Sequence, residues 1–223
     1  MRVDTTIAMA VRAQTPAPVL PHWLRIAAVP PAVAVVLVGI WVAGGVLTND
    51  FRVSMALTAL WFALVVVGAA VAWRRLPALR PAAVAAVAAF VVVGGYLGYA
   101  STTDRVVNET VVTGPAALDG SFRSLAHETS GTARVIERPD GTRVLTLTGF
   151  RTDPGPDLYL YALPGRVPGD DVDGGTSLGR LKGNVGDQQY ALPAALELDR
   201  GATIVIWCRA FSVGFGAATL ASV

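Results

Sequence analysis

The chain has 223 residues, of which 15% are charged, and its mean hydropathy is +0.52. Soluble domains usually carry about 25% charged residues, so this composition indicates a membrane protein. The net charge of +2 combines an arginine-rich first half with a slightly acidic second half, and the second half contains no basic patch that would predict nucleic-acid binding.

Three uncharged runs occupy the first half, at residues 27–47, 53–73 and 81–103. Each run reaches the roughly 20 residues that a helix needs to cross about 30 Å of hydrocarbon. The first run is too long for the apolar core of a cleaved signal peptide, which spans about 7 to 15 residues. We therefore predict three transmembrane helices within residues 24–103. They carry no charged or histidine side chain inside the hydrocarbon that would move ions or protons.

The arginines predict the orientation of these helices. Six of them lie before the first run or between the second and third, against one in the other short loop: Arg2, Arg12, Arg25, Arg74, Arg75 and Arg80 against Arg52. Because lysine and arginine resist translocation, we expect a multi-pass protein of the cell membrane with a cytoplasmic N-terminus and an extracytoplasmic domain after about Thr103. Residues 1–23 are predicted to form a disordered cytoplasmic tail, whose true start is Met1 or Met9.

Short β-rich runs separated by turns fill the second half. A polar linker at residues 104–117 comes first, and the expected strands lie at 120–125, 132–138, 143–150, 157–163, 177–181, 189–192, 203–208 and 216–222. Asp140-Gly141 is a typical hairpin turn between two of these runs. Seven or eight short strands without helical periodicity predict an antiparallel β-sandwich at residues 118–222. The predicted fold class is therefore an N-terminal three-helix transmembrane bundle plus a C-terminal all-β antiparallel sandwich.

Five blocks in the second half follow one another in a recognisable order. They are Ser130-Gly-Thr-Ala133, Gly149-Phe-Arg-Thr152 with Gly155-Pro-Asp-Leu-Tyr-Leu-Tyr161, Leu178-Gly-Arg-Leu-Lys-Gly-Asn184, Gly186-Asp-Gln-Gln-Tyr-Ala-Leu-Pro193, and Ile204-Val-Ile-Trp-Cys-Arg-Ala-Phe-Ser-Val-Gly-Phe-Gly-Ala217. This set resembles the DM13 domain over about residues 118–222, whereas the first half resembles no family that we can name. The resemblance implies an extracytoplasmic β-sandwich, related to DOMON domains, that takes part in electron transfer through a cysteine. In that family the cysteine is proposed to act as a bare thiol or as a ligand to a prosthetic group such as haem, and Cys208 is the matching residue here.

Cys208 is the single cysteine of the chain, so it cannot form an internal disulfide. Alternation along a strand places Ile204, Ile206 and Cys208 on one face, which fits a core role because free cysteine is among the most buried residue types. A redox or ligand role also fits, because Arg209 at the strand end is expected to lower the pKa of the thiol. The sequence leaves both roles open.

Five further residues are candidates for a cofactor site beside Cys208: Trp207, Arg209, Asp157, Lys182 and Tyr190. Asp157 either caps a Pro-Gly-Pro turn or contacts a ligand. Lys182 and Tyr190 lie in a loop that either lines a pocket or satisfies its own backbone. His127 is expected to face solvent, and no residue pattern predicts a metal site.

These observations predict a membrane-anchored extracytoplasmic module that takes part in electron transfer or redox chemistry at the cell surface through Cys208. The alternative is a non-catalytic cell-envelope binding or assembly module in which Cys208 is a core residue. No Ser/His/Asp set, CxxC, HExxH or phosphate-binding glycine loop is apparent, so hydrolysis is not expected and only a redox activity stays open. The expected partners are the membrane and an envelope protein or redox partner.

Overall fold

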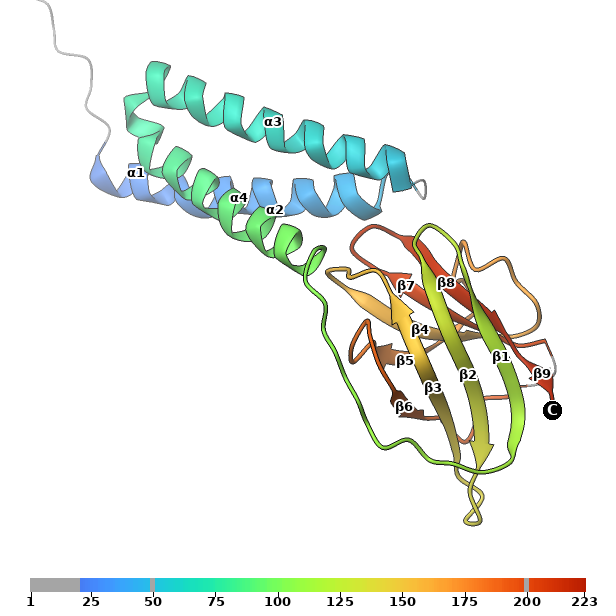
Figure 1. The fold of residues 1–223 in the computed structure, drawn as a ribbon. Coiled ribbons are helices and arrows are strands. Elements are labelled where there is room, and N and C mark those ends of the chain that lie inside the picture. The colour runs from blue at the N-terminus through green and yellow to red at the C-terminus, as the bar shows by residue number, and fades with distance from the viewer. Residues whose placement is uncertain (1–20, 49–50, 199–200) are drawn as a thin grey trace, which may run out of the picture.

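The computed structural model describes residues 21–48, 51–198 and 201–223. Most of the predicted cytoplasmic tail, residues 1–20, lies outside these described residues. A bundle of helices comes first and a β domain follows (Figure 1).

Within the described residues, the bundle contains four α-helices and one short 3₁₀ helix. They are α1 (His22–Ala27), α2 (Val29–Gly45), α3 (Phe51–Arg75), η1 (Pro77–Leu79) and α4 (Arg80–Ala100). Three helical stretches, Trp23–Gly45, Arg52–Arg75 and Pro77–Ala100, are long and apolar enough to cross a membrane. The prediction of three such stretches is confirmed. Many of their large apolar side chains are exposed, as expected of helices that lipid surrounds.

Small residues let these helices approach one another closely. A Cβ atom on Gly39 of α2 would lie only 2.0 Å from the indole ring of Trp61 on α3. The Trp61 Nε1–H donates a hydrogen bond to the carbonyl of Val36 at 3.3 Å. The rings of Phe62 and Phe90 join α3 to α4, edge to face, with their centroids 4.7 Å apart. Gly39 therefore serves packing inside the bundle.

Nine strands follow the helices in the part of the chain that the structure describes. They are β1 (Ala116–Ser124), β2 (Thr129–Glu137), β3 (Arg143–Thr152), β4 (Leu158–Leu163), β5 (Thr176–Arg180), β6 (Gln188–Ala191), β7 (Thr203–Cys208), β8 (Val213–Thr219) and β9 (Ala221–Ser222). Their order is β5-β4-β7-β8-β1-β2-β3-β6, with β9 beside β1, and the paired strands run antiparallel.

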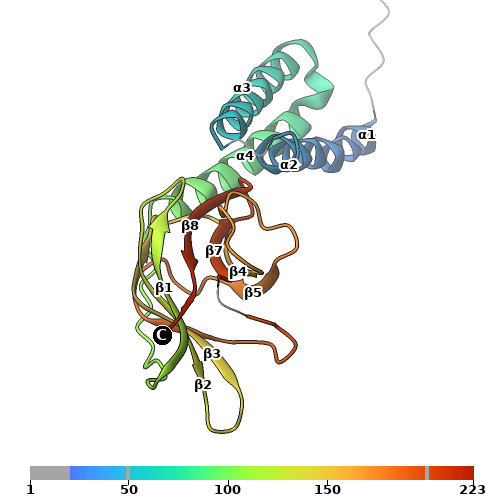
Figure 2. The same ribbon diagram turned by 90° about the vertical axis from the view of Figure 1, so that its right-hand side faces the viewer.

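Strand β1 joins the two halves of this sheet. Its residues 116–121 pair with β2, whereas residues 122–124 pair with β8. The sheet therefore folds over into a nearly closed, sandwich-like or barrel-like domain (Figure 2). The predicted antiparallel all-β architecture is confirmed.

The main core lies between the two halves of the sheet. Ile204, Ile206 and Cys208 of β7 belong to it, whereas Val205 and Trp207 point to a smaller apolar cluster on the opposite face. This division follows from the alternation of side chains along a strand.

Residues 101–115, here called the connector, run from α4 to β1 along the segment before β6. Backbone hydrogen bonds join the two segments, and the Lys182 Nζ lies 2.7 Å from the Glu109 carboxylate. Gly183 and Gly186 allow this approach, because a Cβ atom on them would lie 2.5 Å and 2.1 Å from carbonyl oxygens of the connector. The connector is therefore held against the β domain over much of its length.

Candidate functional site

Cys208 lies at the end of β7, where the β domain meets the helices. None of its surface is exposed, and its strand neighbours are Leu158 on β4 and Val213 on β8. Burial raises the pKa of the thiol to about 11, and nearby peptide groups, including that of Phe211, offset only part of this rise. The sulfur is therefore a protonated thiol at neutral pH, whereas a reactive cysteine needs thiolate character.

Arg209 does not lower the pKa of the Cys208 thiol. Its guanidinium lies over the ring of Tyr159, 3.5 Å from the centroid, and donates a hydrogen bond to Tyr161 Oη at 2.7 Å. The side chains of adjacent strand residues point to opposite faces, so Arg209 lies on the outer face of β4 while Cys208 lies in the core. The expectation that this cation would activate the thiol is wrong for that reason.

The other residues predicted for a cofactor site are distributed over three places. Asp157 forms an ion pair with Arg180 on the outer face of the domain. The Lys182 N–H donates to Tyr190 Oη at 2.9 Å, and burial raises the pKa of this tyrosine to about 12. Trp207 is buried in the smaller apolar cluster. The structure does not bring these side chains together around one ligand.

The surroundings of Cys208 do not fit a haem. A haem ligand needs open space at its sulfur, whereas Cys208 is enclosed by the main core and lines neither of the two cavities described below. Among the described residues, no group of histidine, cysteine and acidic side chains suits a metal ion either. We therefore assign no step to a prosthetic group at Cys208.

The β domain contacts the bundle through two turns. In the β7–β8 turn, Ser212 Oγ donates to the carbonyl of Gly45 at 3.3 Å. In the turn before β4, the carbonyl of Pro156 accepts a hydrogen bond from Tyr96 Oη at 3.4 Å. Both views place the end of α4 beside the ends of β7 and β8 (Figures 1 and 2). Two cavities lie at this junction.

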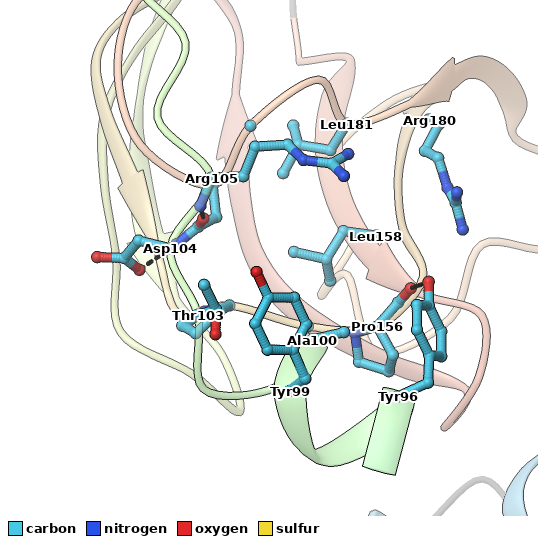
Figure 3. Close-up of a pocket in the computed structure, with 14 residues that line it drawn as sticks. Tyr96, Tyr99, Ala100, Thr103, Asp104, Arg105, Pro156, Leu158, Arg180 and Leu181 are labelled. Carbon is cyan, nitrogen blue, oxygen red and sulfur yellow. Dashed lines mark hydrogen bonds between the residues drawn. The ribbon is translucent and has the colours of Figure 1, made fainter. Parts of the chain in front are cut away.

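The first cavity has a volume of about 230 Å³, and polar and apolar groups share its wall about equally. Tyr96 and Tyr99 at the end of α4, Arg105 of the connector and Arg180 of β5 contribute to its wall (Figure 3). Guanidinium groups and hydroxyls are good donors to small anions.

The second cavity is larger, about 490 Å³, and lies between α3, α4 and the β domain. Its wall is mainly apolar and includes Met55, Phe62, Leu97, Phe211 and Phe215. The segment 154–156 lines both cavities and so lies between them. We call this second space the junction cavity.

His127 lies in the wall of the junction cavity, so the expectation that it faces solvent is wrong. Its Nδ1 is 3.0 Å from Asp153 Oδ2, and its ring stacks on Phe215 with the centroids 3.8 Å apart. Asp153 and Phe215 are distant from it in sequence, so no local pattern signalled this cluster.

The structure combines three helices that are long and apolar enough to cross a membrane with a β domain that contains a buried thiol. Residues 121–220 match the family model described as Electron transfer DM13. The C-terminal half therefore carries a DM13 domain, as its sequence blocks predicted. Neither the search of curated proteins nor the search of solved structures returned a match.

Proposed function

We propose that the protein is a membrane-anchored module that takes part in electron transfer at the outer face of the membrane. The observation that carries this proposal is a domain of an electron-transfer family docked on three helices that are apolar enough to span a bilayer. The arginine distribution supports an extracytoplasmic position for the domain. The two cavities between the bundle and the β domain support the proposal that a redox partner approaches at the membrane edge of the domain.

Within this function the geometry favours a core role for Cys208. A thiol with a pKa of about 11 and no exposed surface meets a partner only if the turn at 209–212 opens. The same burial favours a second candidate function, a non-catalytic cell-envelope binding or assembly module. The two candidates share the role of Cys208 and differ in whether electrons move.

Ferricyanide, an electron acceptor that does not cross membranes, separates the two candidates. Deleting the gene from its host should lower the rate at which intact cells reduce ferricyanide, and a wild-type copy should restore it. A Cys208→Ala copy of equal abundance should also restore the rate if the cysteine is a core residue. Restoration by the wild type alone would assign electron transfer to the thiol, and an unchanged rate in the deletion strain would favour the binding module.

The orientation has a separate test. Alkaline phosphatase, which folds only outside the cytoplasm, should be active when it is fused after Val223, and green fluorescent protein at the same place should stay dark in the outer compartment. The reverse result would overturn the arginine argument and place the β domain in the cytoplasm.

A further inference from the structure

The junction cavity is large enough and apolar enough to hold a ligand. Its volume of about 490 Å³ lies within the roughly 300–1,000 Å³ typical of small-molecule sites. One side is formed by α3 and α4, which are both long enough to span a membrane, and the other by the turns of the β domain. The cavity therefore adjoins two helices that are long and apolar enough to lie in the bilayer.

Two glycines on α4 help to keep this space open. A Cβ atom on Gly94 would meet only the Phe62 Cζ, at 4.0 Å, and one on Gly98 would meet nothing within 4 Å. Phe211 and Phe215, both on the β domain, add two aromatic rings to the wall. Such rings favour a flat, unsaturated ligand, which they can contact face to face or edge to face.

Polar groups are few in this apolar wall. Thr58 Oγ1 and His127 Nε2 are closed off from the free space, so neither offers a hydrogen bond to a ligand there. The Ser101 hydroxyl and the Asp153 carboxylate also belong to the wall. A hydroxyl can donate to a ring carbonyl, and a carboxylate can accept from a ring hydroxyl.

The charge of the wall argues against a phospholipid headgroup. Among the described residues that line the junction cavity there is no lysine or arginine, and Asp153 is the one acidic residue. An anionic phosphate would find no cation there and would meet a carboxylate. A neutral ring with an apolar tail fits the same wall.

We propose that the junction cavity binds the ring headgroup of a membrane-soluble quinone or quinol. The cavity volume, the apolar and aromatic wall and the polar groups of Ser101 and Asp153 carry the inference of a neutral, flat, hydrogen-bonding ligand. The choice of a redox-active ring among such ligands rests on the proposed electron-transfer function.

Photolabelling of the full chain in lipid nanodiscs tests this site. An azidoquinone is activated by light, and the labelled residues are located by mass spectrometry, with and without excess decylubiquinone as competitor. The label should fall on residues 55–62, 94–101 or 211–215 and be lost with the competitor. Labelling that falls elsewhere, or that decylubiquinone does not reduce, would overturn the proposal.

A matched pair of glycine variants controls for general effects on the helix. Gly94→Leu fills the cavity and should reduce labelling at least tenfold. Gly95→Leu adds the same side chain at a neighbouring position of α4 that does not line the cavity, and a Cβ there would meet nothing within 4 Å, so labelling should persist. Equal labelling of Gly94→Leu and Gly95→Leu would contradict the proposal that the ligand binds in the junction cavity.

Ser101→Ala largely retains the shape of the wall and removes a hydroxyl that lines it. Its affinity for decylubiquinone should fall about fivefold, as expected for the loss of one hydrogen bond. Since a variant that fails to fold would bind nothing, this small change keeps the test informative even if Gly94→Leu is unstable. An unchanged affinity would remove Ser101 from the site.

Two comparisons separate the remaining explanations. Displacement of the label by added phosphatidylglycerol, and not by decylubiquinone, would assign the cavity to lipid and overturn the quinone proposal. The binding assay needs no electron flow. Specific labelling together with an unchanged ferricyanide rate in the deletion strain would therefore reject the electron-transfer function and keep the ligand site. Absence of specific labelling together with a lowered ferricyanide rate would reject the quinone site and keep the electron-transfer function.

Discussion

Alkylation of Cys208 in the folded chain should be at least about one hundredfold slower than in the unfolded chain at pH 8. Burial raises the pKa of the thiol from its ordinary value of 9.0 to about 11. The thiolate fraction at pH 8 therefore falls from about one tenth to about one thousandth, and only the thiolate reacts. The enclosed position of the sulfur slows the reagent further.

The assay follows iodoacetamide incorporation by mass spectrometry between pH 7 and 10, in the native full chain and in guanidinium chloride. The native rate should rise about tenfold for each pH unit up to pH 10 because ionisation is incomplete there, whereas the unfolded chain should reach about half its maximum near pH 9 and approach the maximum near pH 10. Native and unfolded rates that coincide, or a native rate that levels off near neutral pH, would refute the burial argument and restore a reactive thiol as the centre of the site.

Three further predictions concern stability. Cys208→Ala should lower the free energy of unfolding by about 1 to 2 kcal/mol, because it leaves a small cavity in a closed core, and urea unfolding of the full chain measures this; an unchanged midpoint would mean that the sulfur packs against nothing. Gly186→Ala should cost more than about 2 kcal/mol, since the new methyl group would overlap the Val107 carbonyl and the residue has a φ of +102°. Faster hydrogen exchange at the amides of Val107 and Glu109 would report the released connector, and unchanged exchange would contradict the close approach. Glu109→Gln should cost less than about 1 kcal/mol, because the ion pair with Lys182 is partly exposed. The hydrogen bond from Lys182 lowers the pKa of Glu109 below 4.5, so the stabilisation is present above the unfolded pKa and is lost as the pH falls through the folded pKa. The difference between wild type and variant in urea should therefore be larger at pH 7 than at pH 3, and a larger difference at pH 3 would refute the assignment.

Local patterns predicted the elements well. The run at 203–208 forms a strand with the predicted bounds because its apolar β-branched residues favour an extended, buried segment. The expected strand at 216–222 instead begins at Val213 and is split into β8 and β9. Ser212, with a φ of 48°, turns the chain sharply enough for β8 to pair with β7 at once. Turn geometry of this kind is not encoded by hydrophobic periodicity.

The candidate site was harder to predict because its parts are far apart in the chain. The pattern of β7 placed Cys208 on the face that it occupies, but the sequence did not show that the end of the strand is closed by the 209–212 turn against α2. Lys182 and Tyr190 were expected in one loop, but Tyr190 lies in β6. Their contacts serve the connector and the backbone. His127 was missed because its partners, Asp153 and Phe215, come from other strands and turns.

The sequence by itself determined the three apolar helices, the antiparallel β domain, its DM13 character and the single thiol. Each of these follows from local composition, alternation or motif order, which are properties of contiguous residues. Only the tertiary structure decided that Cys208 is enclosed, that Arg209 stacks on tyrosines instead of activating it, and that a cavity lies between α3, α4 and the β domain. These features arise where segments that are distant in sequence pack together, and the packing sets the exposure, the pKa and the free space at each side chain.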